Sequence, residues 1–152
     1  MNRQAVLDTR NLMTGKDGEL FVTASDGSNI SLAEVDTFQV QLNVTNTDYQ
    51  PVGSALTFAV NTGFSITLTF TEAVVRDDVM LEKLIADLNA GFIPQFDFQG
   101  KLHRGDKEER QVFRNCIPDG TIDLMNITPG EIIKRSWSFR VNGYPKLMDN
   151  LK

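Results

Sequence analysis

Two segments of the chain alternate between apolar and polar residues almost without interruption, and this pattern constrains the fold more than any other feature. In Glu34–Thr45, every second residue from Phe38 onward is apolar, and the residues between are Gln, Asn or Thr. Phe64–Glu72 repeats the pattern with Ser and Thr between the apolar residues. A period of two residues is typical of a β-strand with one face buried and the other in water. We therefore predict two long, half-buried strands.

Five shorter strands are predicted by the same reasoning, with Gly- and Pro-containing turns between most of them. They cover Glu19–Ala24, Gln95–Leu102, Glu109–Cys116, Thr121–Ile127 and Glu131–Val141. In the last of these strands, Trp137, Phe139 and Val141 alternate with polar residues and are expected to face inward.

A single segment, residues 78–90, has the helical period instead. Its apolar stripe consists of Leu81, Leu84, Ile85 and Leu88. Asp77 or Asp78 can cap the N-terminus of this helix, and Gly91 follows as a stop signal. We therefore predict one amphipathic α-helix of about three turns.

Together these elements predict a mainly β fold, either an antiparallel β-barrel or a two-sheet sandwich, with one packed α-helix. The length of 152 residues fits a single domain, residues 1–152. Within it we expect an N-terminal arm at residues 1–14, a polar hairpin tip or loop at residues 46–55, and a C-terminal segment at residues 145–152 that can form one helical turn.

The edges of such a sheet need protection, because an edge strand presents unpaired backbone groups to any other chain. The predicted strands carry few Lys and no regular Pro, which are residues that natural edges use for this purpose. The edges must then be closed within a barrel or covered by other chains. Self-association is therefore expected from the residues alone.

The net charge and the lack of long apolar segments argue against several classes of function. Fifteen Lys and Arg against twenty Asp and Glu give a net charge of -5, which disfavours tight binding to nucleic acid. The first residues lead into no apolar segment, and no stretch of 18 apolar residues occurs. We therefore expect neither a signal peptide nor a membrane span, and a protein made in the cytoplasm.

No catalytic, cofactor-binding or metal-binding residue is predicted. With one histidine, His103, and one cysteine, Cys116, a zinc site of ordinary composition cannot be assembled within one chain. As a general base His103 lacks a nucleophile with a reason to lie beside it, so we interpret it as a solvated loop residue. Cys116 is interpreted as a buried structural residue. Motifs for phosphate, zinc or calcium binding are missing from the sequence.

The order of features along the chain resembles one known family. The matching features are the Gly15–Gly18 turn within Asn11–Phe21, the alternating strand to Val44, the polar segment through Gly53, the Thr-rich strand Ser65–Phe70, the single helix, the strand at Phe96–Phe98, the strand from Arg110 to about Gly120, and the aromatic strand before Tyr144–Leu147. Over nearly the whole chain this set resembles the tail tube proteins of contractile phage tails, in particular the PBSX-type (XkdM-like) family.

The resemblance implies a fold similar to the haemolysin-coregulated tube protein of type VI secretion. It implies six-subunit rings that stack into a hollow tube, in which strands of adjacent subunits join into one barrel. The implied partners are other copies of the chain, sheath proteins and baseplate proteins, with DNA only as a non-specific passenger and no membrane. Assembly would take place in the bacterial cytoplasm, and the product would be a virion tail or a tail-like particle. The family has no enzymatic residues to carry over.

Two sets of residues follow as expected contact sites. The polar halves of the two alternating strands are expected to face the lumen, and they are Gln39, Gln41, Asn43, Ser65, Thr67 and Thr69. Their apolar partners are expected to pack under the helix. On the polar segment Tyr49 and Val52 are expected to bury against a neighbouring subunit, because an aromatic anchor on a polar loop is a common interface device. Thr47–Val52 carries no cation, although family members often have one there.

Other functions remain open at this point. A small β-barrel ligand-binding module would use the Phe-rich interior for a small molecule. A hydrolase using His103 would need a nucleophile that the sequence does not place. Within the tube hypothesis, a phage tail and a tail-like bacteriocin use near-identical subunits, so the sequence leaves that choice open.

Overall fold

The computed structural model describes residues 9–23, 29–32, 35–74 and 80–149. Its strands are β1 (Gly18–Thr23), β2 (Asn29–Ser31), β3 (Val35–Tyr49), β4 (Phe58–Ala73), β5 (Phe96–Arg104), β6 (Lys107–Pro118), β7 (Lys134–Val141) and β8 (Lys146–Asp149). Its helices are α1 (Leu81–Asn89) and the short 3-10 helices η1 (Thr9–Asn11) and η2 (Gly15–Asp17). The prediction of a mainly β fold with one α-helix is confirmed for the described residues.

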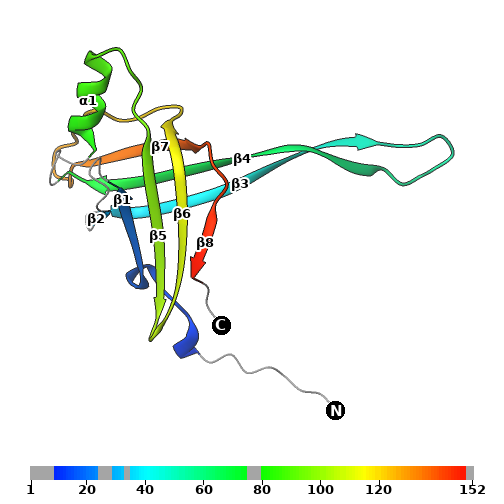
Figure 1. Ribbon diagram of the computed structural model, residues 1–152, viewed down its shortest axis with the longest axis horizontal. Helices are drawn as coiled ribbons and strands as arrows, with labels where there is room; N and C mark the ends of the chain where they lie inside the picture. The colour runs from blue at the N-terminus through cyan, green and yellow to red at the C-terminus, as the bar shows by residue number, and fades with distance from the viewer. Residues whose placement is uncertain (1–8, 24–28, 33–34, 75–79, 150–152) are drawn as a thin grey trace.

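The strands form one antiparallel sheet that folds over on itself. Their order is β2-β1-β5-β6-β7-β4-β3, and β8 pairs with β6. In Figure 1, β3, β4 and β7 run along the length of the molecule, and β1, β5 and β6 run crosswise to them. The arrangement is therefore a two-layer sandwich with near-orthogonal strands, in which one sheet supplies both walls of the core.

The two layers join at a corner in β6. Its last three residues, Cys116–Pro118, pair with Phe139–Val141 of β7. The preceding Asn115 has a φ of 57°, in the left-handed region that Asn tolerates better than most residues. Its N–H donates a hydrogen bond of 2.9 Å to Asp97 Oδ1 on β5. This bond holds the bend at which β6 passes from one layer to the other.

An aromatic cluster fills the space between the layers. Phe70 of β4 stacks on Trp137 and Phe139 of β7, and its ring meets Phe98 of β5 edge-on at a centroid distance of 5.6 Å. The prediction that Trp137, Phe139 and Val141 face inward is confirmed, because all three are buried. Such ring pairs add stabilisation beyond the burial of their area.

One carboxylate lies inside this core. Glu72 at the end of β4 is buried, and Trp137 Nε1 donates a hydrogen bond of 2.8 Å to its Oε1. The opposite residue on β7 is Arg135, which is also buried and whose Nε donates to the carbonyl oxygen of Leu124. Buried polar groups persist where they have such partners, so this group serves the structure.

The helix covers one end of the sandwich. Met80 and Leu84 belong to the buried core, and Lys83 lies over the ring of Phe96 with Nζ 4.8 Å from the centroid. The predicted caps Asp77 and Asp78 lie outside the described residues. Among the described residues the helix spans Leu81–Asn89.

The prediction that the apolar face of β3 and β4 packs under this helix is wrong. Phe38 packs instead on the crosswise layer, where a Cβ added to Gly100 of β5 would meet its ring at 3.1 Å. Leu42, farther along β3, is 61% exposed. The helix is too short and too far to one end to cover strands of this length.

Two further predictions are wrong at the level of secondary structure. Thr121–Ile127 is not a strand, because only two backbone bonds join this part of the chain to β7, from the N–H groups of Asp119 and Asp123. The segment at residues 145–152 contains β8 rather than a helical turn, since the edge of β6 offers backbone partners at Arg110–Val112. A single helical turn has no comparable source of stability. The three-residue strand β2 was not predicted.

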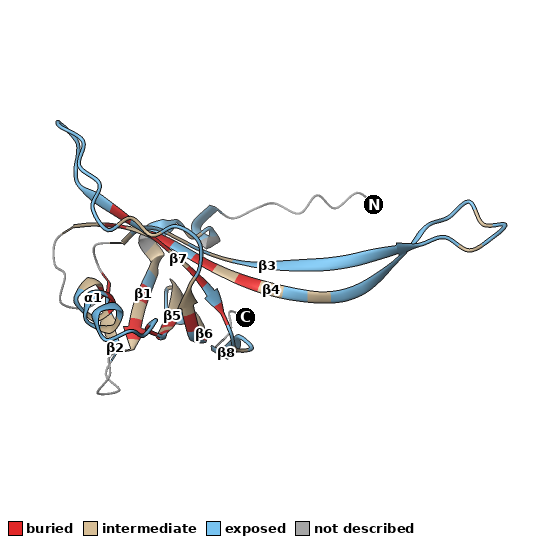
Figure 2. Ribbon diagram, turned by 90° about the horizontal axis from the view of Figure 1, so that it is seen from above, coloured by how far each residue is buried: buried red, intermediate tan, exposed pale blue. Residues whose placement is uncertain are grey.

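A long hairpin extends out of the sandwich (Figure 1). β3 and β4 pair from Val35 to Tyr49, but β7 covers only Thr67–Ala73 of β4. Within the hairpin or loop expected at residues 46–55, strand pairing continues to Tyr49 and resumes at Phe58, so residues 50–57 are the unpaired tip. We call residues 42–66 the arm. Figure 2 colours most of the arm as exposed.

Substitutions on the two paired strands separate core from arm. We expect Leu68→Ala to lower the free energy of unfolding by about 3 kcal/mol, because its side chain is fully buried. Leu42→Ala on the arm removes the same atoms from an exposed position and should cost less than about 1 kcal/mol. Urea denaturation at low protein concentration measures both, and equal losses would contradict the assignment of the arm.

Candidate functional site

The residues between the apolar ones on β3 and β4 form one surface. The register places Gln39 opposite Thr69, Gln41 opposite Thr67 and Asn43 opposite Ser65. Directly opposed residues of an antiparallel pair share a face. All six residues expected at the lumen thus lie together, and we call this surface the polar face. Their place in a lumen stays a prediction.

The polar face continues onto β7. Opposite Thr67, Thr69 and Thr71 of β4 lie Arg140, Ser138 and Ser136 of β7. Side-chain hydrogen bonds cross the strands at Asn43 Nδ2 to Thr67 Oγ1 and between the hydroxyls of Thr71 and Ser136, both at 3.4 Å. The surface is therefore made mainly of short, neutral, hydrogen-bonding side chains.

The charges on this face come in opposite pairs. Lys134 of β7 reaches Asp36 of β3, with 2.6 Å between Nζ and Oδ2. Arg140 lies beside Asp119, with 3.7 Å between Nε and Oδ2. These pairs leave the face without a net charge to hold an ion or a charged polymer.

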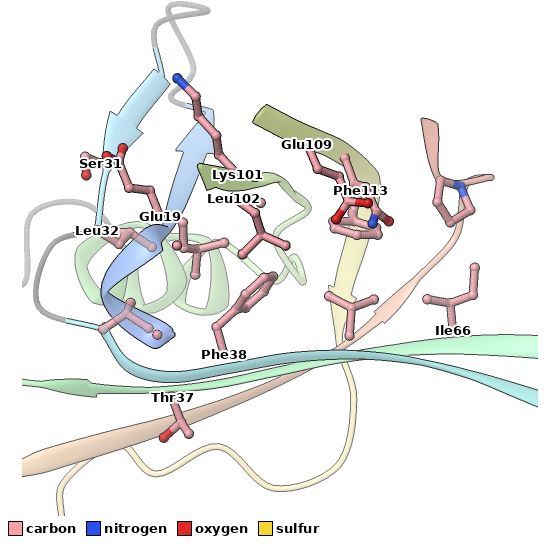
Figure 3. Close-up of a pocket in the computed structure, with 18 of the residues that line it drawn as sticks. Glu19, Ser31, Leu32, Thr37, Phe38, Ile66, Lys101, Leu102, Glu109 and Phe113 are labelled. Atoms are coloured by element: carbon pink, nitrogen blue, oxygen red, sulfur yellow. The ribbon is translucent and has the colours of Figure 1, made fainter. Parts of the chain in front are cut away.

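The opposite surface of the same strands borders a hollow of about 980 Å³. Phe38, Val40 and Ile66 form one wall, and Leu102 and Phe113 of the crosswise layer form the other. Figure 3 shows Phe38 and Ile66 directed into this space from the hairpin side. Its size is at the upper end of ordinary ligand pockets.

The arm also carries apolar side chains that are largely exposed. Of these, Leu42 and Phe64 line the hollow, and the ring of Phe64 lies 6.0 Å from that of Tyr144. The predicted interface residues Tyr49 and Val52 are 61% and 107% exposed. Sequence reasoning missed the other exposed members, which are Leu42, Val44, Leu56, Phe58, Val60 and Phe64. Their apolar character is visible in the sequence, but their exposure follows from the point at which β7 ends along β4, at Thr67, and that point has no local signal.

His103 has no catalytic arrangement around it. It lies in strand β5, not in a loop as predicted, with Nε2 3.6 Å from Glu19 Oε1 and Nδ1 3.8 Å from Glu108 Oε2. A hydrogen bond from Lys101 holds the pKa of Glu108 below its usual value. These neighbours are carboxylates and a cation on the surface of a hairpin, and a nucleophile is not among them.

Cys116 is buried at the corner between the layers, as predicted. Burial, and secondarily the charge of Asp97, raises the pKa of its thiol to about 12. Its Sγ donates to the carbonyl oxygen of Phe113 at 3.6 Å. A thiol of this kind is not a nucleophile near neutral pH.

The described residues lack two kinds of feature. No three His, Cys, Asp or Glu side chains gather as metal ligands in the part of the chain that the structure describes. Among the same residues, no helix is long and apolar enough to cross a membrane.

A neutral polar face and an arm of exposed apolar residues are typical of a protein that acts by surface contact with other chains. A family model described as "Phage tail tube protein" matches residues 5–149. The chain belongs to this family, and it is a structural subunit of a tail tube. No curated protein matches the chain.

Several solved structures are similar in fold. A chain of the anti-feeding prophage baseplate, symmetrised six-fold, is 8% identical, with a TM-score of 0.63 over 98% of both chains. A chain of the native gene transfer agent virion is 13% identical, with a TM-score of 0.63 over 90% of this chain and 99% of that one. The SPP1 tail tube is 13% identical, with a TM-score of 0.69 over 93% of this chain and 81% of that one.

The burial of Cys116 predicts an unreactive thiol. Because its pKa is about 12, we expect Ellman's reagent at about pH 8 to label the native protein at least about 100-fold more slowly than the protein in urea. The unfolded chain also loses this proton first, so Cys116 should make stability fall as the pH rises above 9.0. Rapid labelling of the folded protein would contradict the position of Cys116.

Proposed function

We propose that the chain forms hexameric rings that stack into the inner tube of a contractile phage tail or of a phage-tail-like bacteriocin. The observation that carries this proposal is the match of the tail tube family model over residues 5–149. Six-fold symmetry in two structures of similar fold supports the ring size. A related fold in the sheath-tube complex of an extracellular contractile injection system supports the contractile setting.

In this proposal the polar face lines the lumen. A passage for DNA or a protein should bind nothing strongly along its length, and a face of short neutral side chains with paired charges meets that need. The edge of β3 has no partner among the described strands on the side away from β4. A strand of the adjacent subunit would satisfy these backbone groups and extend the barrel.

The proposed partners are copies of the chain, sheath proteins and baseplate proteins, with DNA only as a non-specific passenger and no membrane. Structures of similar fold come from a baseplate and a sheath-tube complex, which supports this set. Assembly would take place in the bacterial cytoplasm, and the product would be a tail or tail-like particle. The absence of enzymatic activity is part of the proposal, supported by the surroundings of His103 and Cys116.

A ligand-binding module is the second candidate, favoured by the 980 Å³ hollow with its apolar walls. The two candidates differ in what the purified protein does at high concentration. A tube subunit forms rings or tubes visible by negative-stain microscopy, whereas a ligand-binding module stays monomeric.

Replacement of Thr47–Ser54 by a short Gly-Ser linker tests the role of the arm tip. The segment includes Tyr49 and Val52, which contact no core residue, so we expect the monomer to melt within about 2 °C of the parent. The same variant should no longer form rings or tubes. A melting point far below the parent would place the segment in the monomer's core and overturn its assignment as an interface.

The lumenal assignment can be tested with Thr69→Cys, which places a thiol on the polar face while the native Cys116 stays unreactive. In assembled tubes we expect a small maleimide dye to enter the lumen and label residue 69. A maleimide attached to a gold particle wider than the lumen should be kept out and should not react. Unassembled Thr69→Cys protein is the control and should react with both reagents. Efficient gold decoration along the walls of intact tubes would place the polar face outside.

A further inference from the structure

The arm contains a β-bulge that reverses the facing of its apolar side chains. Up to Thr45, which pairs with Gly63, the strands are in regular register, but Asn46 then pairs with Asn61. Thr62 is therefore an extra residue on β4 without a partner on β3. Gly63 beside it has a φ of 155°, which residues with a side chain rarely adopt.

The extra residue changes which side of the ribbon each residue occupies. Every second residue of β4 from Phe58 to Phe70, Thr62 excepted, is apolar, so a regular strand would place them all on one face. Because of the bulge, Phe58 pairs with Tyr49 and Val60 with Thr47. On β3, Thr47 and Tyr49 are an even number of residues from Asn43, so they lie on the same side of the strand as Asn43, which belongs to the polar face.

The arm thus has two apolar surfaces on opposite sides. The proximal surface consists of Leu42, Val44 and Phe64 and faces the same way as the hollow. The distal surface consists of Tyr49, Phe58 and Val60 and lies on the other side of the ribbon. All six side chains are about half exposed or more. In Figures 1 and 2, the two strands cross over each other part-way along the arm, as expected for the strong twist that accompanies a bulge.

Side-chain hydrogen bonds hold the bulge in place. The carbonyl oxygen of Thr45 accepts bonds from Thr62 Oγ1 at 3.1 Å and from Asn61 Nδ2 at 3.4 Å. Asn61 Nδ2 also donates to Asn46 Oδ1 at 3.1 Å. Bulges re-aim side chains, and one fixed by three side-chain bonds sets the direction of the distal surface before any partner arrives.

The composition of the arm points to a second copy of the chain as its occupant. Between Thr37 and Ser65 the only charged residue is Asp48, so the arm offers nothing to recognise a charged partner. The chain itself carries a complementary surface, because most of the lining of its hollow is apolar. The lining includes the exposed residues Phe64, Tyr144 and Pro145, and we call this side the mouth of the hollow. A contact between two different surfaces of the same chain is head-to-tail and can continue from subunit to subunit.

We propose that the distal surface of one subunit docks on the mouth of the hollow of a second subunit, and that the bulge at Thr62 directs it there. Each arm then lies between two bodies. Its proximal surface covers the hollow of its own subunit, and its distal surface covers that of the next. This inference rests on the proposed self-assembly and adds the acceptor surface and the device that aims the arm.

Mixtures of two variants, each with one added cysteine, test the contact, because a cross-linked heterodimer forms only when the link joins two chains. Val60→Cys protein is assembled with Tyr144→Cys protein and treated with a short bismaleimide, and the buried Cys116 does not interfere. Ala59→Cys is the matched control, since its side chain leaves the adjacent position on the opposite face. We expect about tenfold more heterodimer with Val60→Cys than with Ala59→Cys, because one residue along a strand reverses the facing. Equal yields in assembled material, or none from either, would overturn the proposal.

Two length changes test the bulge. One residue inserted between Thr45 and Asn46 would pair with Thr62 and turn Tyr49, Phe58 and Val60 to the proximal side. Deletion of Thr62 also removes the bulge from the strand pairing, but it leaves Tyr49, Phe58 and Val60 on their present side. It is therefore the matched control. We expect both monomers to melt like the parent, the insertion to abolish assembly and the deletion to retain it. Assembly of both variants, or of neither, would overturn the role of the bulge, while ring formation by the parent separately tests the proposed function.

Discussion

The structure depends above all on an aromatic contact, in which Phe70 and Phe139, stacked with Trp137, meet Phe98 of the other layer. It joins the layer of β3, β4 and β7 to the crosswise layer of β1, β5 and β6. A sheet folded at one corner, with only three residue pairs between β6 and β7, would open without it. Since the layers are crosswise, the cluster also fixes where the hairpin leaves the body.

The hairpin is longer than the body can use. β7 covers Thr67–Ala73 of β4, and the nine residues Phe58–Ile66 continue past it. Apolar side chains in that extension lower the solubility of the isolated subunit and add no packing to its core. Such a feature is retained where another chain supplies the missing contacts, which agrees with a family of tube proteins.

Much of the fold was predictable from sequence periodicity. The alternation in β3, β4 and β7 identified the buried residues Leu68, Phe70 and Trp137, because these strands have one wet face and one dry face. Periodicity did not predict the segments whose secondary structure depends on a tertiary partner. β8 forms because the edge of β6 is available, and Thr121–Ile127 stays irregular although its composition suits a strand.

The candidate site was predictable in part for the same reason. Alternation predicts that Gln39, Gln41 and Asn43 share one face with the polar residues of β4, and the strand register places them opposite those residues. The facing of Phe58 and Val60 could not be derived, because a single unpaired residue, Thr62, reverses it, while the apolar residues keep the same even spacing on both sides of that point. The hollow depends on contacts between distant strands and has no local signal in the sequence.

Nearly all the charged residues of the subunit lie outside the arm, and this affects how two subunits first meet. The subunit has a net charge of -5, yet the arm carries one charged residue, Asp48, so nearly all the repulsion between subunits originates in their bodies. Repulsion of this kind is screened over roughly 8 Å at physiological ionic strength. The nine residues of β4 beyond β7 extend about 30 Å at the rise of a β-strand. The arm can therefore touch another subunit while the two bodies are still several screening lengths apart, so the first contact in assembly is made by neutral surfaces.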